Sequence, residues 1–180
     1  MDKNKYIICI EEKLHSGEWP NYCNPQRMAE LDNLADDALS ISKIDATTCI
    51  ASILILQQMT EELLKVLLDS SRFVIQVRLL PLEISFNPLK KAMFGEIVKQ
   101  IESTINFQHK KEIIELANRM NTTRIEIAHK LIEKDNLADL QIKAIEARNN
   151  FEKFLTLYDL AYGWINNHLE ELKLESKRVK

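Results

Sequence analysis

An arginine and a histidine, Arg124 and His129, stand five residues apart in the stretch Asn118–Lys130. The imidazole of a histidine titrates near neutral pH, so it can accept or release a proton during a reaction. The guanidinium of an arginine stays charged and binds a phosphate through two donors. This pair therefore indicates proton transfer at a phosphate group, with His129 moving the proton and Arg124 holding the charge.

Four polar neighbours are candidate supporting or substrate-binding residues: Arg119, Asn121, Glu126 and Lys130. Glu126 precedes His129 by three residues, on nearly the same helical face, where it either orients the imidazole or repels phosphate. Arg119 either grips substrate or belongs to a solvated face, and Asn121 either contacts substrate or bends the backbone. The same region is basic: residues 109–134 hold six Lys or Arg and four Glu, a net charge of +2, in a chain of net charge −3.

Both members of the pair also have ordinary structural interpretations. His129 could be a core or surface histidine satisfied by a nearby carboxylate. Arg124 could be a surface residue paired with Glu126 or Glu133.

Residues Asn121 to His129 form the motif Asn-x-x-Arg-x-x-Ile-Ala-His in the penultimate helix of an all-helical chain. This motif, in a chain of this size, resembles the HEPN superfamily. The resemblance covers about residues 45–170. It implies a metal-independent endoribonuclease without a cofactor, a homodimer whose Arg and His line a cleft between protomers, and a toxin–antitoxin or phage-defence setting with a possible antitoxin or other protein partner.

The resemblance also implies roles. His129 acts as general base or acid at the ribose 2′-hydroxyl or the leaving oxygen, and Arg124 stabilises the scissile phosphate. The products carry 2′,3′-cyclic phosphate and 5′-hydroxyl ends. Five residues turn a helix by about 500°, so the two side chains point some 140° apart, and a dimer cleft repairs that geometry.

Two positions depart from the family pattern. Ile125 follows the motif arginine, where the family commonly has Asn, Asp or His. Leu131 stands where some family toxins carry a tyrosine that a partner antitoxin modifies, so that mode of control does not carry over.

Composition excludes several other classes of site. The three glycines, at positions 17, 95 and 163, are isolated, which excludes glycine-rich phosphate loops and dinucleotide fingerprints. No histidine has a second ligand at metal-binding spacing, so no metal site is expected. Three unpaired cysteines and the lack of a long apolar run predict a reduced, cytoplasmic protein without a membrane span.

Apolar spacing predicts an all-α fold, an up-and-down bundle of four to five helices with a long C-terminal helix. Residues 1–24 form a poorly readable segment that includes a possible strand at Tyr6–Ile10, residues 25–174 form one bundle domain, and residues 175–180 fray. Helices are expected from Pro25, over about 45–70, from Asn87-Pro88, over about 108–132, and from Leu137 behind an Asp135-Asn136 cap. Residues 72–86 are interpreted as a connection or a frayed helix end. Trp19 and Trp164 are expected to be buried anchors rather than base-stacking platforms.

Two functions other than cleavage remain open. The chain could be a non-catalytic HEPN-like helical module for protein–protein interaction, which Ile125 and the overall acidity favour. It could also bind nucleotides or RNA without cleaving them.

Overall fold

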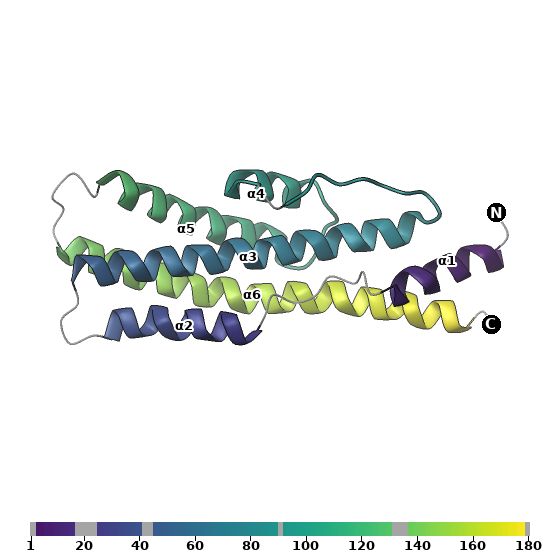
Figure 1. Cartoon of the computed structure of the whole chain (residues 1–180), viewed down its shortest axis with the longest axis horizontal. Coiled ribbons are helices and arrows are strands. Elements are labelled where there is room, and N and C mark those ends of the chain that lie inside the picture. Colours follow the sequence, from purple (N-terminus) through teal and green to yellow (C-terminus); the bar gives the residue numbers. More distant parts are fainter. Residues whose placement is uncertain (1–2, 17–24, 41–44, 90–91, 131–136, 179–180) are drawn as a thin grey trace. The chain divides into compact units, whose positions relative to one another are not determined.

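The computed structural model describes residues 3–16, 25–40, 45–89, 92–130 and 137–178, and the regular secondary structure of these residues is entirely helical (Figure 1). The side chains of residues 3–5, 129, 130, 137 and 178 lie outside the description. The described helices are α1 (Lys3–His15), α2 (Pro25–Ser40), α3 (Ala46–Leu79), α4 (Phe94–Glu102), α5 (Lys110–Lys130) and α6 (Leu137–Arg178). The predicted all-helical class and long C-terminal helix are confirmed.

Local sequence signals explain two of the helix starts. Pro25 opens α2 as its first residue, where its missing N–H costs no helical hydrogen bond. Before α3, the Asp45 carboxylate accepts the backbone N–H of Thr48 at 2.9 Å, and the Thr48 hydroxyl accepts the N–H of Asp45 at 3.2 Å. This reciprocal cap satisfies donors that a helix start otherwise leaves unpaired. The Asp135-Asn136 cap expected before α6 lies outside the described residues.

Three expected element boundaries are wrong. The possible strand at Tyr6–Ile10 is part of α1, whose buried residues Ile7, Ile10 and Leu14 repeat at helical spacing. The connection expected over 72–86 begins only after Leu79, because Val74 and Val77 continue the buried face of α3. Asn87-Pro88 starts no helix, since residues 83–88 have no regular structure.

The fourth helix instead starts six residues after that proline, at Phe94, with Met93 as its N-cap residue. Its buried side chains explain the helix, because they form a single apolar face that packs inward. These residues are Phe94, Ile97, Val98 and Ile101.

The chain forms two compact units, and α3 and α6 each contribute to both. Unit 1 comprises Met1–Asn21, Leu64–Gln108 and Asp159–Lys180. Unit 2 comprises Tyr22–Leu63 and His109–Tyr158. Among the described residues, no helix combines the length and apolar character needed to cross a membrane.

Unit 2 is built from α2, the first part of α3, α5 and the first part of α6. Its largest side chains without solvent exposure come from α3, α5 and α6: Ile53, Leu56, Leu63, Ile113, Phe151, Phe154 and Tyr158. The Thr60 hydroxyl of α3 lies 3.3 Å from the Met120 sulfur of α5, a buried contact between these two helices. In Figure 1, α5 and the first part of α6 run in opposite directions, and the ion pair of Glu126 with Lys143 at 3.1 Å shows that they are neighbours.

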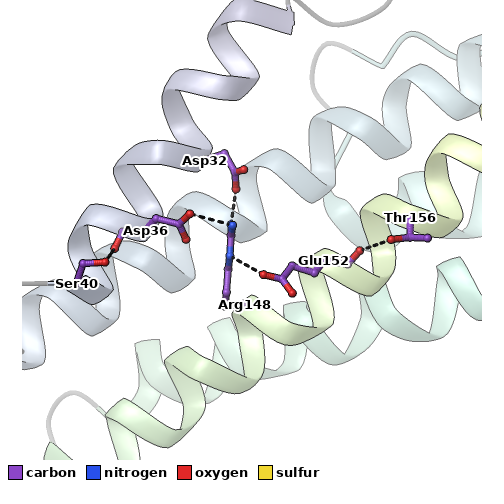
Figure 2. A network of polar contacts seen from close by, with 6 residues as sticks. All are labelled: Asp32, Asp36, Ser40, Arg148, Glu152 and Thr156. Atoms are coloured by element: carbon purple, nitrogen blue, oxygen red, sulfur yellow. Dashed lines mark hydrogen bonds and ion pairs between the residues drawn. The ribbon is translucent and has the colours of Figure 1, made fainter.

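An arginine joins α2 to α6 in unit 2. Figure 2 shows Arg148 of α6 between three carboxylates. Its guanidinium contacts Asp32, Asp36 at 3.1 Å and Glu152 at 3.3 Å. Burial acts to lower the pKa of Arg148, but the hydrogen bond and charge of Asp32, helped by Asp36 and Glu152, outweigh it and raise that pKa. Arg148 thus interrupts the apolar stripe of α6 in order to hold α2.

Unit 1 holds its own buried arginine. Arg72 of α3 donates to the Gln100 side-chain oxygen, lies 3.5 Å from Asp69, and stacks over the Phe86 ring at 5.2 Å. One turn later, the Gln76 side chain donates to the Leu82 carbonyl at 2.9 Å and accepts the Ile84 N–H at 3.0 Å. These contacts fasten the segment after α3 to that helix.

Candidate functional site

Helix α5, which lies in unit 2, carries all six residues expected to form the site. The Arg124 side chain is exposed and makes no ion pair with a described residue. The carboxylate of Glu126 pairs with Lys143 of α6 at 3.1 Å, and not with Arg124. The side chains of His129 and Lys130 lie outside the description, although the backbone of both belongs to α5.

Arg124 takes a position that elsewhere in α5 faces the core. It follows Ala117 by seven residues and precedes Ile127 by three, and both of these are buried. Arg124 is nevertheless exposed, as are its neighbours Ile125, at 43%, and Ala128. The inner face of α5 is therefore uncovered by described residues at this level, and Arg124 is accessible there.

A groove of about 680 Å³ lies between α5 and α6 within unit 2. Every side chain that lines it is polar or charged, unlike most small-molecule sites, which are mainly apolar. From α5 the lining includes Asn118, Arg119, Thr122, Thr123 and Glu126, and from α6 it includes Lys143, Glu146, Asn149, Asn150 and Lys153.

The groove has two unlike ends, because its helices run in opposite directions. At one end Glu126 is neutralised by Lys143. At the other end lie Arg119, seven residues before Glu126 on α5, and Lys153, ten residues after Lys143 on α6. Neither pairs with a carboxylate among the described residues. Positive charge without a carboxylate partner therefore lies at the Arg119–Lys153 end. The lining also includes Glu146 of α6, so its three cations and two carboxylates sum to +1.

The groove brings together two of the expected supporting residues, Arg119 and Glu126, but its lining does not include Arg124 or Asn121. Arg124 follows Thr122 by two residues, which places it about 200° around the helix from that groove residue. The Asn121 side-chain oxygen is buried without a hydrogen-bond partner among the described residues, so this oxygen points into the protein and not into the groove.

The α6 side of the groove was not expected. Its residues repeat at three- and four-residue steps, which is the spacing of one helical face, so a polar stripe on α6 was the available signal. The partner helix of that stripe is set by packing, which the sequence pattern does not specify.

Other side chains that could take part in chemistry or binding already contact one another. A cavity of about 450 Å³ in unit 1 includes Arg72 and Asp69, which contact each other. Trp164, expected to be buried, is 38% exposed and stacks in parallel on His168 at 5.5 Å. Trp19 lies outside the described residues.

Metal ligands and the buried thiol of Cys49 offer no further centre among the described residues. No group of three His, Cys, Asp or Glu side chains gathers there in a way that could hold a metal ion. Cys49 is a fully buried free thiol, and its pKa is raised by burial and by the charge of Asp45. A raised pKa disfavours the thiolate, the form that attacks electrophiles and binds metals.

Comparison of the chain with protein-family models, curated proteins and solved structures finds no match in any of the three.

Proposed function

We propose that this chain is a metal-independent endoribonuclease of HEPN type that acts as a homodimer, in a toxin–antitoxin or phage-defence setting in the cytoplasm. The observation that carries the proposal is the Arg-x-x-x-x-His motif on α5, with Arg124 exposed and unpaired among the described residues at an uncovered part of that helix. Arg148, which holds α2 against α6, is by contrast engaged by carboxylates.

The proposed reaction is a transesterification that needs no oxidant and no metal. The ribose 2′-oxygen attacks phosphorus, the bond from phosphorus to the 5′-oxygen breaks, and a 2′,3′-cyclic phosphate forms. The imidazole of His129 takes the 2′-hydroxyl proton as a general base and then gives it to the departing 5′-oxygen as a general acid. Arg124 stabilises the charge that develops on the phosphate.

Two features support the homodimer. Arg124 and His129 occupy positions about 140° apart around one helix, so a second copy would help to bring an arginine and a histidine to one phosphate. The same end of unit 2 exposes three large apolar side chains, Ile125 of α5 at 43%, and Ile142 and Ile145 of α6 at 56% and 55%. A second copy of the chain would remove these isoleucines from water.

The test is cleavage of mixed single-stranded RNA by the purified full chain in EDTA, with analysis of the new ends. We expect cyclic phosphate and 5′-hydroxyl ends from the wild type. Arg124→Gln and His129→Gln are expected to lose roughly 10²- to 10⁴-fold in rate, because each removes a group that acts in the transition state.

Matched controls separate this loss from a general effect of charge or folding. Arg27→Gln alters an exposed arginine of α2, and His168→Gln alters a histidine of unit 1. Both should retain activity. A wild type without cleavage, or motif variants as active as the controls, overturns the proposal.

The groove favours one second candidate, the binding of RNA without cleavage. Its polar lining and its free cations do not depend on Arg124. Under that function the motif variants bind RNA as the wild type does, and no form of the protein produces new ends.

A further inference from the structure

We infer that the groove between α5 and α6 binds the sugar–phosphate backbone of a single RNA strand. The choice of RNA rests on the proposed function, and the groove deepens it by adding a substrate site on the opposite side of α5 from Arg124. None of the α6 residues that line the groove belongs to the motif.

The charges of the groove suit a phosphate at one end. Arg119 and Lys153 are both exposed, come from different helices, and carry no carboxylate partner among the described residues. A cation that already has such a partner must give it up in order to bind phosphate, whereas these two need not. Arg119 offers a planar fork of donors that fits phosphate oxygens, and Lys153 adds a second positive charge.

The middle of the groove suits ribose. Asn149 and Asn150 of α6 carry amides, which both donate and accept hydrogen bonds, and they line the groove together with Thr122 and Thr123 of α5. Glu146 of α6 also lines it and places a carboxylate three residues before Asn149. The two threonine hydroxyls already donate to the backbone carbonyls of Asn118 and Arg119, so their oxygens remain as acceptors. The 2′-oxygen of a ribose can accept from the amides whether or not it is methylated, and an unmodified 2′-hydroxyl can also donate to the threonine oxygens.

The lining also argues against recognition of the base itself. Proteins that bind single strands through bases stack them on aromatic rings. The groove is lined by amide, hydroxyl and charged side chains without an aromatic ring. Binding should therefore tolerate any base sequence and depend on the backbone.

The length of the groove sets the size of the bound segment. Arg119 and Glu126 are seven residues apart on α5, which corresponds to roughly 10 Å along the helix. A stacked strand rises about 3.4 Å per nucleotide, so the groove accommodates about three nucleotides. Its Glu126 end lies three residues before His129 in the chain.

The experiment measures binding of a fluorescent, fully 2′-O-methylated oligoribonucleotide to the full chain by anisotropy, in EDTA and across a salt series. This probe cannot be cleaved, because its 2′-oxygens are blocked. The test variant is Arg119→Gln with Lys153→Gln. The matched control is Lys99→Gln with Lys177→Gln, which removes the same charge from exposed residues of unit 1.

We expect the test variant to bind more than about tenfold more weakly than the wild type at low salt. The slope of log affinity against log salt should become shallower by about 1.4, or 0.7 for each lost phosphate contact. Over a fourfold rise in salt, the affinity of the variant should therefore fall by a factor about seven times smaller than that of the wild type. Glu126→Gln, which releases Lys143 from its ion pair, should tighten binding severalfold. Circular dichroism confirms that each variant is folded.

The result that overturns the inference is a test variant that binds like the matched control, or a wild type that does not bind the probe. Active cleavage together with that result leaves the nuclease proposal standing and removes the groove from it. Binding that depends on Arg119 and Lys153, in a protein that never cleaves RNA, removes the nuclease proposal and keeps the groove.

Discussion

In unit 2, cationic side chains lie on two sides of α6, and they differ in whether carboxylates compensate their charge. Toward α2, Arg148 is only 17% exposed and contacts three carboxylates, as Figure 2 shows. Toward α5, Arg119 and Lys153 line an open groove without a carboxylate partner among the described residues. The positive charge of Arg148 therefore holds α2 in place, while the charges of Arg119 and Lys153 remain available to a ligand.

This difference separates structural cations from candidate functional ones without reference to any relative. A partly buried cation surrounded by carboxylates has its charge compensated inside the protein. An exposed cation in a concave polar surface is compensated only by water and dissolved ions, so its charge remains available to an anionic ligand. Lys143 lies between the two cases, because it faces the groove but pairs with Glu126.

The largest contrast should appear in stability. Arg148→Ala leaves three carboxylates close together without their cation, and we expect it to lower the free energy of unfolding by about 1–2 kcal/mol, a value that allows for the exposure of those carboxylates. Arg119→Ala should change the same free energy by less than about 0.5 kcal/mol, because the residue is exposed and unpaired. Urea unfolding at constant m-value measures both.

Equal losses from the two variants would contradict this contrast. Asp32→Asn with Asp36→Asn serves as a control, because in an Arg148→Ala background it should recover part of the lost stability by removing the repulsion.

A smaller effect concerns the ion pair of unit 1. Burial raises the pKa of Asp69 above its ordinary value of 3.8, and the charge of Arg72 at 3.5 Å does not overcome that effect. The folded protein therefore holds this proton more tightly than the unfolded chain does. Asp69 should then add to stability below pH 3.8, and its contribution should fall as pH rises from 3.8 through the raised pKa.

The measurement is the free energy of unfolding across acidic pH for the wild type and Asp69→Asn. We expect the variant to lack this loss and to be no less stable than the wild type at neutral pH. A variant that is clearly less stable at neutral pH would show that the Arg72–Asp69 pair stabilises unit 1, as the Arg148 contacts are expected to stabilise unit 2.

Apolar periodicity was sufficient for most of the fold and failed at short segments. The stripe of α6 and the first-turn Pro25 of α2 each identified a helix. Tyr6–Ile10 misled because five consecutive apolar or weakly polar residues show no period, and the helical spacing appears only when Leu14 is included. Asn87-Pro88 misled because a residue before proline also favours extended backbone.

The motif helix of the site was visible in the sequence, and its groove was not. Arg119 and Glu126 were recognised as neighbours of Arg124 and His129. The groove residues of α6 lie opposite them only because α5 and α6 pack antiparallel, and the Lys143–Glu126 ion pair shows how the two helices are aligned. Asn121 was recognised as polar, but its burial comes from packing that a pattern of residue types does not encode.

The most direct test of the central claim is complementation between inactive variants. Arg124→Gln and His129→Gln protomers, co-expressed with different tags and purified as the mixed dimer, are assayed for RNA cleavage in EDTA beside each variant alone. If two subunits supply the arginine and the histidine to one phosphate, the mixed dimer regains part of the wild-type rate while each variant alone stays inactive. A mixed dimer as inactive as its two parents contradicts the account.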